Sequence, residues 1–511
     1  MKLAEIKIIE SKININDIYT IACYDPDKKV IYIGTGFYDF CMKFGEEALA
    51  AILAHELGHY YYSHQAIYTI QGFYLSTEKR KELEKELDLK KLDTTTLQPH
   101  ETQADMFAAY RCLLAGYDIE SAMPKILEET YNLKNLGDGQ IHEDYLPLDK
   151  RKLISKNAID KIKKLIPLIN AGKYLYILGE YELAAKCYDN VQVRGFDSWE
   201  IFYNAAISYT LAITDYLNDN KKFIYPFEIQ SNSLISKYRT NELSSKGADS
   251  KGNIDVSETI QRLTETAKNR FYTVKSKQPD ISILYILNNA CLDYISGNIE
   301  EAISNIKNIP DDIEDLRTKF LVSLAKGIIY SEDTKVAEME FDKAAKYEFE
   351  CFGHTGFVDY NRNILRGKQP DILSAGFETS FIGNETICGY VISKMLDEVD
   401  FNTVHYPETK VGYVKYRQIN VGTYSGDRCK AYEIEIENKI YHFIETMPCY
   451  NETTLRGIKI NDEVNNIQIK YGDPSRLVLS EDGEYYLYER SKIIFKVRDS
   501  KVVGWMLFEM K

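Results

Sequence analysis

Two histidines and a glutamate that could perform metal-dependent hydrolysis stand together in the segment His55-Glu56-Leu57-Gly58-His59. Residues four apart lie on the same face of a helix, so both imidazoles can reach one zinc ion. Glu56 would then face a water beside the metal and act as its general base. With 8 histidines in the chain, this pattern is expected by chance roughly 0.02 times. The alternative is a buried helix in which two histidines stack incidentally.

Residues 45–65 are predicted to form the helix that positions this motif. Two acidic residues, Glu46 and Glu47, fall in its first turn, where the helix dipole favours negative charge. Apolar side chains recur at helical spacing at Ala48, Leu49, Ile52, Leu53 and Leu57. This face is expected to be buried.

A second helix is predicted over residues 98–117. Pro99 suits its first turn and Gly116 suits its end. Glu101 and Asp105 are four positions apart and therefore share one face. The helix thus presents a pair of carboxylates in the same way that the first helix presents a pair of imidazoles.

The two helices together resemble the zinc metallopeptidases of the HtpX and CAAX prenyl protease family, a gluzincin group. The resemblance implies one Zn²⁺ per chain, held by His55, His59 and Glu101. It gives Asp105 the role of orienting a ligand histidine, and His64 lies where family members often carry another histidine. It also implies an endopeptidase that cuts protein substrates, as in protein quality control.

The resemblance covers residues 14–155 and has two departures. The family commonly has Arg directly after the aspartate, whereas this chain has Met106. The family also commonly has a His-Pro-x-x-x-x-Arg segment. In the corresponding segment this chain has Tyr145 in place of the histidine and Arg151 at the end. Tyr145 could donate a hydrogen bond to a developing oxyanion. His142 is a rival for this role, and Tyr145 could instead simply pack in a chain with 40 tyrosines.

In the implied mechanism, zinc polarises the scissile carbonyl and lowers the pKa of water towards about 7. Glu56 takes the proton of this water and passes it to the leaving amine. Residues 30–34 are predicted to be a strand, which at a sheet edge beside the first helix would bind an extended peptide by strand addition. The mixed-charge residues 76–92 are expected to form a helix, either a lid over the cleft or a solvated surface helix.

Composition limits the classes of partner and the compartment. The net charge of -14 argues against a nucleic acid or an anionic membrane, because phosphate binding needs a basic surface. Nine scattered cysteines without a CxxC pair indicate reduced thiols and a cytoplasmic protein. The chain has no run of eighteen apolar residues, so no membrane span is predicted. A periplasmic location is the alternative if a signal peptide has been removed.

Residues 157–370 are predicted to form tetratricopeptide-like helical pairs. Gly172 and Ala206 are 34 residues apart, which is the period of that repeat, and Ala302 and Ala337 take the same tight-packing position. Such arrays bind a peptide substrate or a regulatory protein, although a scaffold that only stabilises the peptidase would look the same. A peptidase of this family followed by these repeats resembles the BepA-type architecture.

Residues 371–511 are expected to be a β-rich α+β module, because apolar and aromatic residues alternate between turn signals. Residues 457–474 are predicted to form a strand and a short helix before a meander of strands. The expected fold class is thus a multidomain α+β protein with a zincin-like domain in residues 1–156, the helical repeats and this module. The alternative to an active peptidase is a non-catalytic or latent repeat scaffold that binds partner proteins.

Overall fold

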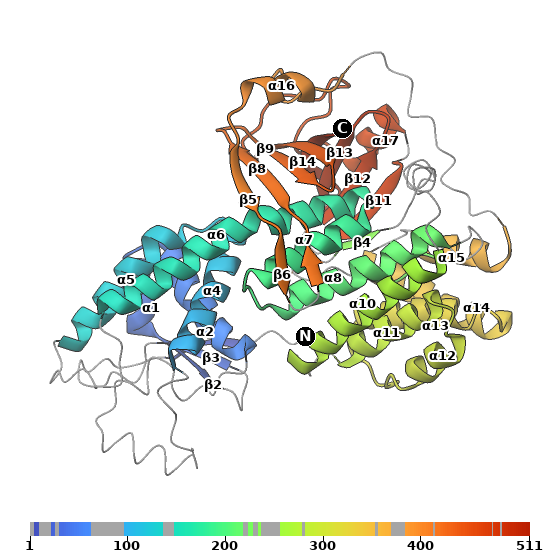
Figure 1. The fold of residues 1–511 in the computed structure, drawn as a ribbon, viewed down its shortest axis with the longest axis horizontal. Coiled ribbons are helices and arrows are strands. Elements are labelled where there is room, and N and C mark those ends of the chain that lie inside the picture. The colour runs from blue at the N-terminus through green and yellow to red at the C-terminus, as the bar shows by residue number, and fades with distance from the viewer. Residues whose placement is uncertain are drawn as a thin grey trace, which may run out of the picture. The chain divides into compact units, whose positions relative to one another are not determined.

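The computed structural model describes residues 5–9, 22–25, 30–62, 97–135, 148–217, 223–227, 234–236, 256–277, 282–352, 356–368, 384–411, 414–472, 474–480 and 483–511. The chain is a mixed helix and sheet protein with a C-terminal antiparallel sheet, which confirms this part of the expected fold class. It divides into two compact units, Met1–Ile166 and Pro167–Lys511 (Figure 1). Among the described helices, none is long and apolar enough to cross a membrane.

A small mixed sheet lies in the first unit. Its strands are β1 (Glu5–Ile9), β2 (Ala22–Asp25) and β3 (Val30–Gly34), in the order β1-β3-β2. Strand β3 runs parallel to β1 and antiparallel to β2. The predicted strand over residues 30–34 is confirmed, but it is not a sheet edge, because neighbouring strands already take the hydrogen bonds on both sides of β3. The condition for strand addition at β3 is therefore not met. Ile31 and Ile33 are buried, as expected of a central strand.

Among the described residues of this unit, the helices are α1 (Thr35–Met42), α2 (Glu46–Tyr61), α4 (Leu97–Ala115) and α5 (Ile119–Asn135). The predictions of helices around HELGH and around Glu101 are confirmed by α2 and α4. These two helices pack closely at one point, where a Cβ added to Gly58 would lie 2.9 Å from the Ala104 Cα atom. Only glycine permits this approach, so Gly58 sets the spacing between the histidine helix and the glutamate helix.

Helix α6 (Leu148–Leu178) has 31 residues and runs from the first unit into the second. Two ion pairs hold its first half against α5. Lys152 lies 2.8 Å from Glu128, and Lys163 lies 2.5 Å from Glu120. Arg151, in the same half, is buried.

The second unit contains helical pairs. Its helices are α7 (Tyr181–Val193), α8 (Trp199–Ile213), α10 (Val256–Lys277), α11 (Ser282–Ile295), α12 (Ile299–Lys307), α13 (Leu316–Ile329), α14 (Thr334–Phe352) and α15 (Phe357–Leu365), with a short 3-10 turn at η3 (Thr214–Tyr216). Close packing at glycine joins α6 to α7, where a Cβ on Gly172 would lie 2.9 Å from the Tyr188 ring, and α13 to α14, where Gly327 faces Phe341. Helices α8 and α10 also pack together, and this pairing has no counterpart in the predicted repeats.

A nine-stranded antiparallel sheet follows, in the order β4-β11-β12-β13-β14-β10-β9-β8-β5. Its strands are β4 (Leu234–Ser236), β5 (Asn402–Tyr406), β8 (Ile419–Ser425), β9 (Cys429–Ile436), β10 (Lys439–Thr446), β11 (Arg476–Ser480), β12 (Gly483–Tyr488), β13 (Ile493–Arg498) and β14 (Lys501–Met510). Strands β6 (Thr409–Val411) and β7 (Val414–Tyr416) form a separate pair, and α16 (Ile392–Glu398) and α17 (Val464–Tyr471) are short helices. The predicted short helix and meander are confirmed by α17 and by β12 to β14, whereas residues 457–462 form no strand.

Buried polar and aromatic contacts join this sheet to α6 within the second unit. Arg476 on β11 is fully buried, and its Nη1 donates a hydrogen bond to the Ile177 carbonyl at 2.9 Å. The Tyr174 ring stacks on Phe443 of β10, with ring centroids 4.9 Å apart. The end of α6 is thereby built into the same core as the sheet.

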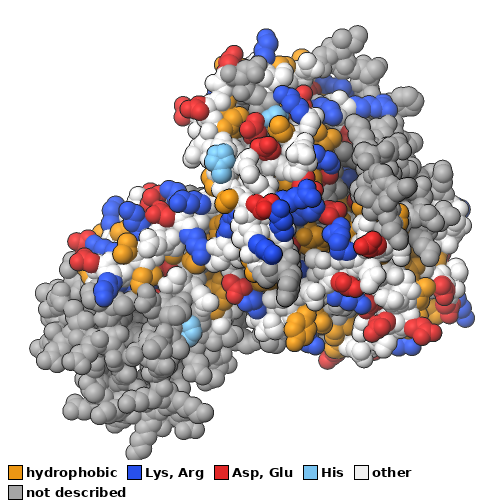
Figure 2. All heavy atoms as spheres, in the orientation of Figure 1, with side chains coloured by type: hydrophobic (Ala, Val, Ile, Leu, Met, Phe, Trp, Pro, Cys, Tyr) orange, Lys and Arg blue, Asp and Glu red, His pale blue; other side chains and the backbone are white. Residues whose placement is uncertain are grey.

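The surface carries charges of both signs. Lys and Arg side chains are interspersed with Asp and Glu side chains on the face shown in Figure 2. Many are paired, as where Glu338 lies 3.3 Å from Arg362 and 2.8 Å from Arg366. Such exposed pairs add little to stability but keep the surface solvated.

Candidate metal centre

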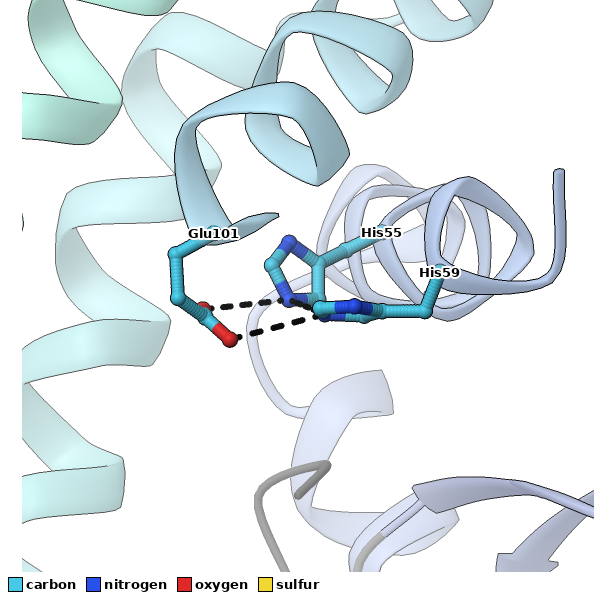
Figure 3. Close-up of side chains that lie close together, drawn as sticks. All are labelled: His55, His59 and Glu101. Carbon is cyan, nitrogen blue, oxygen red and sulfur yellow. Dashed lines mark hydrogen bonds and ion pairs between the residues drawn. The ribbon is translucent and has the colours of Figure 1, made fainter. Parts of the chain in front are cut away.

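His55 and His59 lie on adjacent turns of α2 and direct their imidazoles to the same point (Figure 3). Their Nε2 atoms are 3.1 Å apart, and both side chains are buried. An isolated pair of buried imidazoles has few ways to satisfy both nitrogens. A third group at the point where the two Nε2 atoms converge would satisfy both of them.

Glu101 provides this third group from α4. Its Oε2 lies 3.5 Å from the His55 Nε2, and its Oε1 lies 3.5 Å from the His59 Nε2. One ligand atom from each of the three residues lies within 4.8 Å of the other two. His55, His59 and Glu101 thus form a group that could hold a metal ion.

The spacing of these atoms fits a small tetrahedral ion. Ligands at about 2.0–2.1 Å from such an ion are separated from one another by about 3.3 Å. The two Nε2 atoms are 3.1 Å apart, which is close to this value, and each lies 3.5 Å from a different oxygen of Glu101. With one ligand atom from each residue within 4.8 Å of the others, the three side chains could share one ion after they adjust.

Asp105 holds the far side of the His55 ring. Its Oδ1 lies 2.9 Å from the His55 Nδ1. Burial alone would raise the pKa of Asp105, but the charge of Arg151 and the hydrogen bonds from His55 and Arg151 lower it to about 2. Because Asp105 is therefore ionised, the Nδ1–H of His55 donates to it, and the Nε2 of His55 faces Glu101 and His59.

The protonation of His55 is linked to these carboxylates. Burial lowers the pKa of His55, but the hydrogen bond to Asp105 and the charges of Glu101 and Asp105 outweigh burial, so the pKa lies above its usual value. A metal ion at Nε2 would compete with a proton for the same lone pair.

Glu56 is a buried polar group of the site for which no partner lies among the described residues. It has no exposed surface, and neither carboxylate oxygen has a hydrogen-bond partner among the described residues. Burial raises the pKa of Glu56 to about 8, in spite of the opposing charge of His55. An ionised carboxylate in such a place needs a cation or a hydrogen-bond donor beside it. This orphaned side chain fits a site built around a metal ion and its water.

Arg151 also belongs to the site, although no role there was predicted for it. Its Nη2 donates to the Glu101 Oε2 at 3.0 Å and to the Asp105 Oδ1 at 2.9 Å, and its Nη1 donates to the Asp105 Oδ2. The available signal was its place at the end of the segment that resembles His-Pro-x-x-x-x-Arg. That signal identifies the residue but not its contacts.

Several predicted residues cannot be placed with this group. His64, His142 and Tyr145 lie outside the described residues, as do residues 76–92. Met106, which replaces the arginine common in the resembling family, is buried on α4. The described part of the site thus consists of the predicted His55, Glu56, His59, Glu101 and Asp105, joined by Arg151.

Comparison with known proteins adds no family assignment. No family model, no curated protein and no solved structure matches this chain.

Proposed function

We propose that this chain is a zinc-dependent endopeptidase of the HtpX and CAAX prenyl protease kind. The observation that carries the proposal is the convergence of His55, His59 and Glu101 from two helices, beside the buried carboxylate of Glu56, for which the described residues offer no hydrogen-bond partner. A structural metal site would need no such unpaired carboxylate. A hydrolytic site needs a base in that position.

Zinc is the ion that this donor set favours. Two imidazoles and one carboxylate leave a fourth tetrahedral position open, which is the arrangement of catalytic rather than structural zinc sites. Bound there, zinc would polarise a carbonyl group and acidify a water molecule.

The side chains of the chain perform the proton transfers. Glu56 removes a proton from the attacking water through its carboxylate and then delivers that proton to the amine of the departing peptide. Asp105 fixes the ring of His55 during these steps through the hydrogen bond to Nδ1. Tyr145 or His142 would donate a hydrogen bond to the developing oxyanion.

The remaining residues would serve in recognition. We propose a zincin-like domain in residues 1–156, tetratricopeptide-like repeats in residues 157–370 and a β-rich module in residues 371–511. The close helix packing at Gly172 and Gly327 supports the repeat assignment. The repeats would recruit a protein substrate or a regulatory protein.

A cleavage assay with Glu56→Gln tests this function. The purified full chain with one equivalent of zinc should cleave casein, and the variant should lose turnover while it keeps the metal, because glutamine preserves the shape but cannot accept the proton. Glu46→Gln, at the exposed start of the same helix, is the matched control and should cleave normally. Full activity of Glu56→Gln would refute the assignment.

A further inference from the structure

Arg151 joins the two carboxylates of α4 in the candidate metal centre. Through three hydrogen bonds its guanidinium contacts both oxygens of Asp105 and the Oε2 of Glu101. The exposed fraction of its side chain is 5%, against 17% for Glu101 and 0% for Asp105. Arginine is suited to this place because its rigid fork can bind two oxygens at once.

The charges of the site show why a cation is needed there. Glu101 and Asp105 are one turn apart on α4, where like charges repel. With Glu56 they bring three negative charges when all are ionised. Arg151 offsets one of them, and a divalent cation would offset the other two. Neutrality would therefore require both the arginine and the metal.

The geometry separates two roles that Arg151 could play. One is only to supply positive charge, which any cation at this place would do. The other is to fix the carboxylate of Glu101, because the Oε2 that faces His55 at 3.5 Å also accepts from Arg151 at 3.0 Å. A carboxylate held in this way has one oxygen engaged and the Oε1 turned towards His59 at 3.5 Å.

We propose that Arg151 is a positioning residue that makes Glu101 a single-oxygen ligand of the metal and holds Asp105 against His55. This inference rests on the metal site of the proposed function. It adds a specific consequence: the arginine fork keeps the ion four-coordinate when one water is bound, because a Glu101 that binds through both oxygens would make it five-coordinate.

Substitution of Arg151 can separate positioning from charge. Arg151→Lys keeps the charge but cannot bridge both carboxylates, and Arg151→Met removes the charge and the bridge. If Arg151 supplied only charge, the lysine variant would equal wild type and the methionine variant would bind a divalent cation more tightly. The positioning role predicts that both variants bind the metal more weakly, by roughly 10-fold or more.

The experiment uses Co²⁺ as the probe in the full chain. Affinity is measured by competition with a chelator, and coordination is read from the visible absorption of Co²⁺, which weakens as the coordination number rises from four to five. Both Arg151 variants should show weaker binding and weaker visible bands. Lys152→Met is the matched control, because Lys152 pairs with Glu128 on α5 instead, and it should match wild type.

The outcomes distinguish this inference from the proposed function. A folded wild-type chain that binds no Co²⁺ would refute the metal site and this inference with it. A wild type that binds Co²⁺, together with an Arg151→Lys variant of unchanged affinity and spectrum or an Arg151→Met variant of tighter affinity, would refute the positioning role alone. Because Arg151→Lys retains the buried charge, it provides the test if Arg151→Met fails to fold.

Discussion

The Nδ1 atom of His55 on α2 lies 2.9 Å from the Oδ1 atom of Asp105 on α4. This hydrogen bond joins the two helices that supply the candidate metal ligands, and it fixes which nitrogen of His55 faces Glu101. Residues that orient ligand histidines in this way contribute strongly to metal affinity. The relationship therefore gives the site both its geometry and its tautomer.

Replacement of Asp105 by asparagine should weaken metal binding. The amide is neutral and has only one acceptor oxygen, whereas the carboxylate accepts from both His55 and Arg151. The imidazole of His55 is therefore held less firmly. We expect metal affinity to fall roughly 10- to 100-fold, measured by chelator competition. Asp39→Asn, an exposed position on α1, serves as the control. Unchanged affinity in Asp105→Asn would show that other contacts orient His55.

Glu56→Gln should stabilise the metal-free protein in a pH-dependent manner. Burial raises the pKa of Glu56 from the usual 4.5 to about 8, so its contribution to stability is fully present below pH 4.5 and is lost as the pH rises through 8. Glutamine carries no charge, so the variant does not lose stability in this way as the pH rises. At pH 7 the metal-free variant should be more stable than wild type by on the order of 3 kcal/mol.

Urea unfolding in the presence of a chelator at pH 5 and pH 8 measures this difference. The stability gain of Glu56→Gln should be larger at pH 8 than at pH 5. The same gain at both pH values would mean that Glu56 is ionised in the folded protein as it is in the unfolded chain, so that burial does not raise its pKa.

Gly58→Ala should damage the metal site through backbone packing. Alanine normally stabilises a helix relative to glycine by roughly 1 kcal/mol. Here its Cβ would lie 2.9 Å from the Cα and 3.1 Å from the carbonyl oxygen of Ala104, and overpacking costs about 1–3 kcal/mol. Since α4 must then move and carries Glu101 with it, we expect lower stability together with weaker metal binding.

Ala50→Gly is the control for Gly58→Ala. Ala50 is half-buried on the same helix, and glycine there costs roughly 1 kcal/mol in helix propensity without a steric clash. This control should lose stability but keep its metal affinity. Equal metal affinity in both variants would contradict the proposed role of Gly58.

Gly179→Ala should destabilise the second unit. Gly179 follows α6 with φ +85, and a Cβ there would overlap the buried guanidinium of Arg476. Gly297, with φ +87 and no atom within 4 Å of an added Cβ, suffers only the backbone strain. We expect Gly179→Ala to lose more stability than Gly297→Ala in thermal unfolding, and neither variant to lose its metal. Equal losses would show that Arg476 moves aside freely.

Local sequence patterns predict the helices of the site. They do not predict which distant segments pair with one another. The apolar spacing around HELGH predicts α2, and Pro99 near the start and Gly116 at the end predict α4. Both predictions are correct because helix formation depends on nearby residues. The central place of β3 could not be predicted, since alternating side chains do not reveal which strands lie on either side. Strand β4 likewise joins β11 from far away in the sequence.

The same limit applies to the site itself. The four-residue spacings predict that His55 and His59 share a face and that Glu101 and Asp105 share another. The contact of Arg151 with both carboxylates depends on how α6 packs beside α4, which no local pattern encodes. The roles of His64, His142 and Tyr145 stay predictions, because these residues lie outside the described part of the chain.

Metal analysis of the purified full chain tests the central claim most directly. Wild type, His55→Ala, Glu101→Ala and a His442→Ala control would be compared for zinc content, with His442 chosen because it pairs with Glu433 in the second unit. The proposed site predicts about one zinc per chain in wild type and in the control, and none in the two ligand variants. A folded wild-type chain without zinc, or zinc retained in both ligand variants, would contradict it.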